Sequence, residues 1–213
     1  MKKRLIIILI NSLFVICLFA QSNIAVSKQY FDKARNKSLK GDKRGAILDY
    51  TKAIELNPKN SRAFSQRGFI KEGLGDYRGA ILDLTKCIEL IESADPAYTV
   101  YILFYRALAK ENIKDYQGAI LDYSRGIEIA GIAKSDYLFA QRGIVKNKLE
   151  DYQGAILDFN KCIELNPKFP DAYYGRGFAK YSLNDKNGAC LDWSQAGELG
   201  NSEAYSTIKE KCN

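Results

Sequence analysis

The feature that most constrains the fold of this chain is a ten-residue pattern that recurs five times. Its copies are GDKRGAILDY, GDYRGAILDL, KDYQGAILDY, EDYQGAILDF and NDKNGACLDW. The sixth residue of each copy is an alanine, which serves as the anchor of its unit: Ala46, Ala80, Ala119, Ala155 and Ala189. Successive anchors are 34, 39, 36 and 34 residues apart, and a period of 34 is that of a repeated pair of helices. The 213 residues are therefore expected to form an elongated array of such pairs.

Each copy of the pattern is expected to open the second helix of its unit. An aspartate four residues before the anchor, such as Asp151, can accept hydrogen bonds from the unpaired N–H groups of a helix start. The glycine and alanine that follow are small and would let the two helices approach closely. Apolar residues then recur at helical spacing, as in Ala155, Phe159 and Ile163. The pattern thus predicts an all-α fold.

Two longer strings carry a resemblance to a known family. AFSQRGFIKEGLGDYRGAILDLTKCIEL and AYYGRGFAKYSLNDKNGACLDWSQAGEL resemble tetratricopeptide repeats, and the resemblance covers roughly residues 27–203. It implies a right-handed superhelical solenoid of five helix-turn-helix repeats plus a C-terminal capping helix. The predicted segments are a signal peptide at 1–20, a linker at 21–26, repeats at 27–60, 61–99 with a loop insertion, 100–135, 136–169 and 170–203, and the capping helix at 204–213.

The N-terminus has the layout of a secretory signal peptide. Three basic residues at positions 2–4 precede an almost entirely apolar stretch over 5–19, and small residues follow from Ala20. The stretch is short for a membrane span, which needs about 20 apolar residues. We expect an exported protein, periplasmic or secreted, and keep an uncleaved N-terminal anchor as the alternative. A lipoprotein at Cys17 is set aside because Ile16 is too large for lipobox processing.

Composition argues against catalysis and against most other ligands. The chain has no histidine, which removes the commonest general base, imidazole-based triads and most zinc sites. Loss of residues 1–20 would take away three positive charges and reduce the formal net charge from +7 to +4, and no basic stripe with interleaved aromatics indicates nucleic acid. We expect no cofactor, metal, nucleic acid or small-molecule substrate. Carboxylate chemistry by Glu72 and Glu111 is the enzyme alternative, without a paired acid and base to support it.

A charge pattern recurs with the same period. A basic residue lies thirteen positions before each anchor, as Lys33 in the first unit and as arginine in the others, and an aspartate lies three positions after it. An arginine on a partly buried face needs an anionic partner. We predict structural ion pairs in units two to five: Arg67 with Asp83, Arg106 with Asp122, Arg142 with Asp158, and Arg176 with Asp192. The alternative is that these arginines bind acidic partners.

Four cysteines follow the signal segment. Cys87 and Cys162 occupy the buried small-residue position seven after the anchor and are expected to be core residues. If the chain reverses near Gly200, antiparallel helices bring position 190 opposite about position 211. We therefore predict a disulfide between Cys190 and Cys212, which export would permit.

The resemblance also implies where a partner would bind. In tetratricopeptide families the first helices line a groove that holds a peptide, and the inward positions are 18, 15, 11 and 8 before each anchor. The groove residues predicted in this way are Phe31, Arg62, Phe69, Tyr101, Phe104, Leu108, Tyr137, Ile144, Tyr174, Phe178 and Tyr181. Packing between neighbouring first helices is the alternative role, above all for Phe69, Leu108, Ile144 and Phe178. The leading hypothesis is that the protein is an exported scaffold or adaptor that binds a protein or peptide. The alternative is a membrane-anchored structural or assembly component of the cell envelope. In either case, contact with the membrane is expected only if the N-terminal segment is uncleaved.

Overall fold

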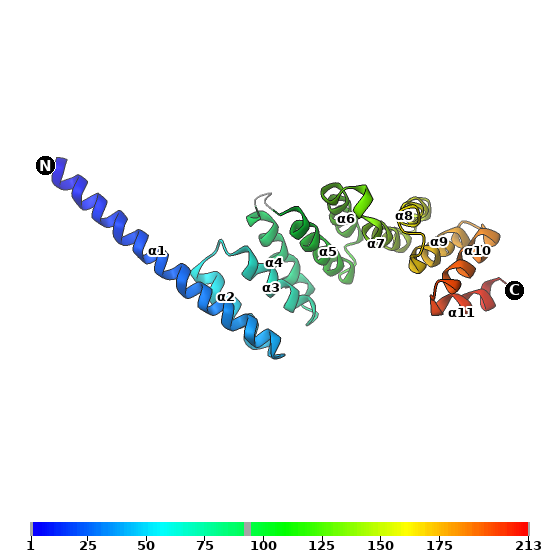
Figure 1. The fold of residues 1–213 in the computed structure, drawn as a ribbon, viewed down its shortest axis with the longest axis horizontal. Coiled ribbons are helices and arrows are strands. Elements are labelled where there is room, and N and C mark those ends of the chain that lie inside the picture. The colour runs from blue at the N-terminus through cyan, green and yellow to red at the C-terminus, as the bar shows by residue number, and fades with distance from the viewer. Residues whose placement is uncertain (1, 92–94, 213) are drawn as a thin grey trace. The chain divides into compact units, whose positions relative to one another are not determined.

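The chain is an all-α helical repeat solenoid, as the sequence pattern predicts. The computed structural model describes residues 2–91 and 95–212, with side chains described from residue 21 onward. Over these ranges it contains eleven α-helices, one 3-10 turn and no β-strand (Figure 1). The chain divides into two compact units, Met1–Glu92 and Ser93–Asn213, and each unit is described by itself.

The first unit holds two helix pairs. Helix α1 packs on α2, α3 packs on α4, and α2 also contacts α3, so the second helix of one pair joins it to the next. The bounds of these helices are α1 (Lys2–Leu39), α2 (Lys43–Leu56), α3 (Ser61–Glu72) and α4 (Tyr77–Leu90).

The second unit holds three helix pairs and a final helix. Each first helix packs on the second helix of its own pair, α7 and α9 also pack on the second helix of the pair before them, and α7 contacts α9. The first helices therefore lie on one side of this unit. The bounds are α5 (Pro96–Asn112), α6 (Tyr116–Ala130), η1 (Ile132–Lys134), α7 (Asp136–Lys148), α8 (Tyr152–Leu165), α9 (Pro170–Ser182), α10 (Lys186–Glu198) and α11 (Ser202–Lys211).

The predicted signal peptide at residues 1–20 lies outside the part of the chain whose side chains are described. Residues 21–26, which were predicted to be a linker, are helical and belong to α1. No glycine or proline interrupts the chain between Gln21 and Gly41, whose positive φ of 84° lets the helix end. Among the described side chains, no helix combines the length and apolar character needed to cross a membrane.

The loop insertion predicted for the repeat at 61–99 is wrong in part. Residues 92–94 lie outside the described residues, but Pro96 is the first residue of α5 and not part of a loop. Proline is well tolerated at the first helical position because its missing N–H has no partner there in any case. The Asp95 side chain accepts from the N–H of Tyr98 at 3.0 Å and caps the helix. Residues 96–99 therefore extend the first helix of the third repeat.

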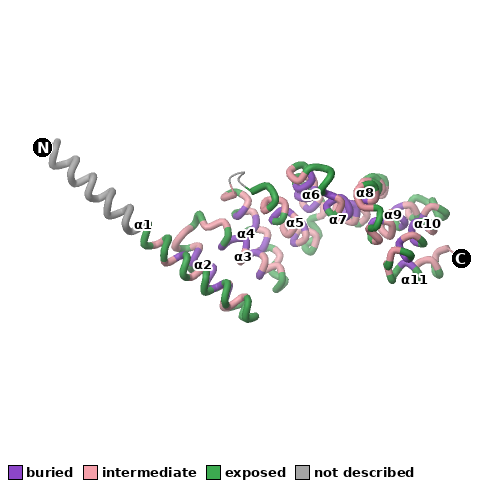
Figure 2. The backbone as a smooth tube through the Cα atoms, in the orientation of Figure 1, coloured by how far each residue is buried: buried purple, intermediate pink, exposed green. Residues whose placement is uncertain are grey.

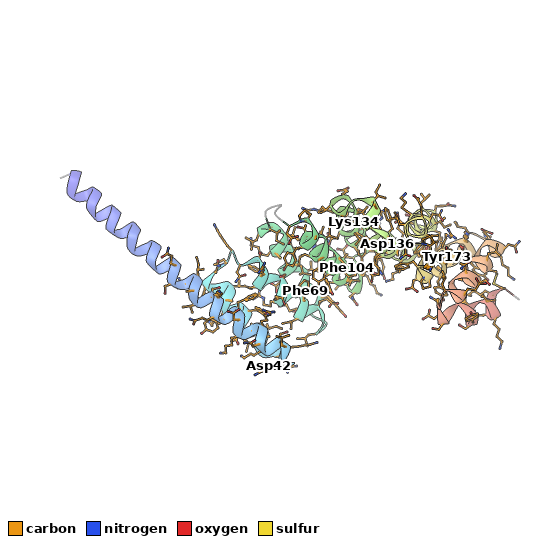
Figure 3. All side chains as sticks on the ribbon, in the orientation of Figure 1. Asp42, Phe69, Phe104, Lys134, Asp136 and Tyr173 are labelled. Atoms are coloured by element: carbon orange, nitrogen blue, oxygen red, sulfur yellow. A yellow bond between two sulfur atoms is a disulfide. The ribbon has the colours of Figure 1, made fainter. Side chains whose placement is uncertain are left out.

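The aspartate of the recurring pattern caps every second helix. In all five copies its side chain accepts from the N–H of the glycine three residues later, at 2.8–3.0 Å; Asp42 of the first copy is labelled in Figure 3. A Cβ on such a glycine, for example Gly154, would collide with the carboxylate of Asp151. The glycine of the GA pair is thus required by the cap and not, as we expected, by the neighbouring helix. Gly143 on α7, by contrast, does let the two helices of its pair approach closely, because a Cβ there would lie 3.0 Å from the Phe159 ring.

The core forms where the two helices of each pair meet (Figure 2). Every anchor alanine is fully buried, and the residue four positions later fills the space between the helices. These five larger residues are at most 1% exposed: Tyr50, Leu84, Tyr123, Phe159 and Trp193. Cys87 and Cys162 are buried free thiols, in agreement with a packing role.

An aspartate of each second helix faces two cations of the first helix. In the second unit, Arg142 donates to both carboxylate oxygens of Asp158 at 2.7 and 2.9 Å, and Lys146 lies 2.8 Å from the same carboxylate. Only 4% of Asp158 is exposed. The other three predicted pairs have the same geometry: Arg67 with Asp83, Arg106 with Asp122, and Arg176 with Asp192.

The lysine in this arrangement was missed at the sequence level, although it recurs nine positions before each anchor. The corresponding lysines of the other repeats are Lys37, Lys71, Lys110 and Lys180. In the first repeat this lysine is the main partner of the aspartate, because Lys37 Nζ lies 2.7 Å from Asp49 whereas Lys33 Nζ lies 3.8 Å away and is largely exposed. Lysine is a point charge and does not reproduce the two parallel hydrogen bonds of arginine.

Helix α11 covers the last pair and is held by a disulfide. It begins two residues before the predicted start because Asn201 accepts from the N–H groups of Glu203 and Ala204. Cys190 of α10 and Cys212 form a disulfide, with their Cα atoms 5.9 Å apart. The cross-link ties the end of the chain to the final repeat.

Replacing Arg142 with alanine should lower the free energy of unfolding by about 2–4 kcal/mol, because it leaves a buried carboxylate with only one of its two cations. Urea denaturation followed by circular dichroism measures this change. The control is Lys161→Ala, which breaks an exposed pair with Glu164 and should cost less than about 1 kcal/mol. Unchanged stability of Arg142→Ala together with lost partner binding would contradict the structural role.

Reduction should add two reactive thiols to the denatured chain, since Cys190 and Cys212 are joined. Loss of the cross-link in the double Cys190→Ser, Cys212→Ser variant should destabilise the second unit by about 3 kcal/mol.

Burial raises the pKa of Cys87 to about 11, and burial together with Asp136 raises that of Cys162 to about 12. Both should therefore resist alkylation in the folded chain at pH 8. Mass spectrometry after alkylation counts the thiols, and an equal count before and after reduction would exclude the disulfide.

Candidate interaction surface

Six of the eight predicted groove residues of the second unit gather around two hollows on the first helices. One hollow lies along α7, α9 and the start of α11, and the other lies along α5 and α7. The hollow along α5 and α7 is lined mainly by apolar and aromatic side chains, whereas the other combines three apolar or aromatic side chains with five polar or charged ones. Surfaces of this kind are the usual places where a protein holds a ligand.

The first hollow has a volume of about 480 Å³ and contains three predicted residues: Ile144, Tyr174 and Phe178. Phe178 is 46% exposed, which is high for a phenylalanine. The Tyr174 hydroxyl shares a hydrogen bond of 3.2 Å with Thr207 of α11, so its ring is fixed in place. The hollow therefore contains the fixed ring of Tyr174 and the more accessible ring of Phe178.

Polar groups surround this apolar floor. Asn147 and Lys148 come from α7, and Asp171 comes from the start of α9. The Asn147 amide donates to the carbonyl of Gly175 at 2.9 Å, which links neighbouring first helices. Asn201 and Glu203 come from the start of α11, so the capping helix forms part of the hollow. The sequence predicted only a capping role for this helix and no part in the hollow. The one signal available in the sequence is Asn201, a typical N-cap residue, which sets where α11 begins.

The second hollow has a volume of about 370 Å³ and contains Tyr101, Phe104 and Tyr137. Phe104, labelled in Figure 3, packs its ring 5.4 Å from that of Tyr137, and Tyr137 lies 6.0 Å from Phe169. Even so, Tyr101 is 46% and Tyr137 is 47% exposed. The rings are thus held by one edge and open on the other, as amphipathic contact residues are.

Two of the three tyrosines on α5 also interact with each other. The Tyr101 and Tyr105 ring centroids lie 4.7 Å apart. A hydrogen bond to Tyr105, together with burial, raises the pKa of Tyr101 to about 12. Tyr101 therefore remains a neutral phenol throughout the physiological range and can take part in hydrogen bonds with a peptide backbone.

Three predicted groove residues line neither of these hollows nor the first-unit cavity described below. Phe69 of α3 and Leu108 of α5 are half-buried, which fits the packing role kept open for them. Tyr181 lies against Trp193, with ring centroids 5.6 Å apart, and Lys211 lies over its other face at 5.2 Å. Tyr181 thus helps to join the last repeat to the capping helix.

In the first unit, Phe31 and Arg62 line a separate cavity of about 510 Å³. Phe31 also contacts Tyr50 edge to face at 5.4 Å, so its ring is shared between the cavity and the core. The remaining lining of this cavity is mostly polar.

The structure gives Glu111, considered above for carboxylate chemistry, a packing role. It accepts from the hydroxyl of Tyr123 at 2.8 Å and pairs with Lys148 at 2.8 Å, which links two neighbouring repeats. Burial, and after it the neighbouring Glu111, raise the pKa of Tyr123. Among the side chains described, no three His, Cys, Asp or Glu residues are grouped so that they could hold a metal ion.

Comparison with known proteins identifies the repeats. A family model described as "TPR repeat" matches residues 144–184, and one described as "Tetratricopeptide repeat" matches residues 28–60. No curated protein sequence matches the chain.

Solved structures with the same fold cover most of the chain. MamA is 23% identical with a TM-score of 0.72, over 86% of this chain and 94% of MamA. YrrB, described as a TPR protein with an unusual peptide-binding site, is 16% identical with a TM-score of 0.73, over 85% of this chain and 90% of YrrB. The first TPR of Spaghetti (RPAP3), solved bound to the HSP90 peptide SRMEEVD, is 23% identical with a TM-score of 0.51, over 55% of this chain and 92% of that one. With five in-phase copies of the pattern and family matches at residues 28–60 and 144–184, the comparisons support the predicted resemblance to tetratricopeptide repeats.

Proposed function

We propose that this protein is a scaffold or adaptor that binds a peptide segment of another protein and catalyses no reaction itself. The observation that carries the proposal is the pair of hollows on the first helices of the second unit. Tyr101, Tyr137 and Phe178 are each close to half exposed there, although aromatic side chains are ordinarily buried in a fold of this kind. Rings that are fixed by packing supply contact area to a partner at little entropic cost.

The partner segment is proposed to be apolar or aromatic. Ile144 and Phe178 form an apolar floor, and Asn147 and Tyr174 supply polar groups beside it. Two of the structurally similar proteins, YrrB and Spaghetti, are described as peptide-binding, which supports a peptide as the kind of ligand. The proposal for this chain nevertheless depends on its own side chains, because likeness at this level of identity shows the fold alone.

We also propose that the protein is exported, on the basis of the charge and hydropathy pattern of residues 1–22. The mass of the mature N-terminus tests this proposal. A chain that starts at Gln21 supports cleavage and release, whereas an intact N-terminus in the membrane fraction would support the anchored envelope component instead.

Substituting the exposed rings should weaken binding without unfolding the protein. A peptide selected from a displayed library on the full chain, kept in a neutral detergent, serves as the probe. Tyr101→Ala combined with Tyr137→Ala should weaken its binding at least about tenfold, because interface energy is concentrated in central aromatic residues. Isothermal titration calorimetry measures the affinity, and circular dichroism should show unchanged helical content.

The matched control is Leu121→Ala combined with Leu157→Ala. Both leucines are 69% exposed, but they lie on second helices, away from the hollows. Their replacement should leave the affinity within about twofold of the wild type. Equal weakening by both double variants would contradict the proposed surface.

A further inference from the structure

Helix α11 forms one wall of the hollow along α7 and α9, but few of its own side chains are buried. Of its ten residues, all of which the structure describes, Ala204 alone is buried. Tyr205 lies against Gly197 of α10 and is still 62% exposed. An isolated helix of this length is only marginally stable in water. The apolar packing that holds α11 in place is therefore small.

The disulfide adds a constraint that this packing does not supply. Cys190 lies on α10, and Cys212 is the C-cap residue of α11, so the bond closes a loop that contains the whole of α11. A cross-link restricts the conformations that are open to the segment it encloses when that segment is not packed. The docked position of α11 is therefore expected to depend on the bond.

The same segment holds part of the hollow in place. The Asn201 amide donates to the carboxylate of Asp171 at 3.0 Å, and Thr207 shares a hydrogen bond of 3.2 Å with the hydroxyl of Tyr174. Asp171 and Tyr174 both line the hollow. Thr207 lies inside the loop that the disulfide closes. Release of α11 would consequently free the ring of Tyr174 and move one wall of the hollow away.

The two kinds of cysteine in the second unit differ in their access to a reductant. Cys190 and Cys212 are half-buried, whereas Cys162 is fully buried in the core. Disulfides that reach the surface are the ones that are readily exchanged, and structural ones are protected. Thiol–disulfide exchange at Cys190 and Cys212 would leave the core of the repeats untouched.

We propose that the Cys190–Cys212 disulfide is a redox switch for the hollow along α7, α9 and α11. The hollow holds its ligand when the bond is formed and loses affinity when the bond is reduced. The inference rests on the proposed function, which supplies a peptide segment as the ligand, and it adds a means of regulating that site. Export, also proposed above, would bring the chain to a compartment in which disulfides form.

The switching step is reduction of the bond by a dithiol. A thiolate of the dithiol attacks one cysteine sulfur, which breaks the S–S bond and releases the other cysteine as a thiolate that takes up a proton. The second thiol of the reductant loses its proton and displaces the first cysteine from the mixed disulfide. Two electrons and two protons pass to the cysteines, which become thiols, and the dithiol becomes a disulfide.

The probe for the test is a peptide that binds at this hollow. It is selected from a displayed library on the oxidised full chain in a neutral detergent and depleted of members that still bind the Phe178→Ala variant. Isothermal titration calorimetry with and without dithiothreitol should show affinity at least about fivefold weaker after reduction, the size of a typical coupling between two sites. Removal of the reductant and reoxidation should restore the affinity.

Hydrogen–deuterium exchange locates the change. The amides of residues 202–211 should exchange faster in the reduced protein, because a helix that is no longer docked opens more often. Circular dichroism should show that most of the helical content is kept. Loss of helical content throughout the chain would mean that reduction unfolds the protein, and would overturn the inference of a local switch.

Two variants separate the disulfide from the free thiols. Cys190→Ser combined with Cys212→Ser should bind the peptide as weakly as the reduced wild type and should not respond to dithiothreitol. The matched control is Cys87→Ala combined with Cys162→Ala, which keeps the disulfide and places at both sites the residue found at the equivalent position Ala53. It should respond to dithiothreitol as the wild type does.

Equal affinity of the oxidised and reduced wild type would overturn the inference, and so would a response to dithiothreitol in the double serine variant. A library that loses every binder when depleted on Phe178→Ala would also overturn it, since the hollow then binds no peptide. In that case the proposed function still stands if the undepleted binders are weakened by Tyr101→Ala combined with Tyr137→Ala. If the wild type selects no peptide at all, both fail.

Discussion

The interaction on which the structure depends is a buried aspartate shared by two cations from the facing helix. Asp158, with Arg142 and Lys146, is one of five such groups, and each joins the two helices of one repeat. Because the two cations are four residues apart on the first helix, they lie on the same face and fix its rotation. The residues on its other face, which form the hollows, are oriented by the same contact.

Once that rotation is fixed, the residues 18 and 11 positions before each anchor decide the chemistry of the inner surface. In the third and fourth repeats these positions hold Tyr101 and Tyr137 with Leu108 and Ile144, and in the fifth they hold Asp171 and Phe178. In the first repeat they hold Lys28 and Arg35 instead. One repeating frame thus presents mostly aromatic and apolar side chains in the second unit and cations in the first repeat.

Much of the fold could be predicted because the pattern occurs five times in one chain. Five copies reveal which positions are small, which are charged and where the second helices begin, so the arginine–aspartate pairing was visible from its recurrence. The start of α5 could not be predicted in this way, because Pro96 is compatible both with a loop and with a first helical position. Only the capping hydrogen bond of Asp95 distinguishes the two. The contribution of α11 to a hollow was also missed, since it depends on how a non-repeated segment folds back.

Hydrogen–deuterium exchange of the full chain with and without the selected peptide shows which helices the peptide contacts. We expect slower exchange, on binding, in α7 and α9 around Ile144 and Phe178 and in α5 around Tyr101, with α6, α8 and α10 unchanged. Backbone amides exchange more slowly where a ligand suppresses local opening, so the pattern reports which helices the peptide stabilises. Slower exchange confined to α6, α8 and α10 would place the binding surface on the second helices and contradict the account.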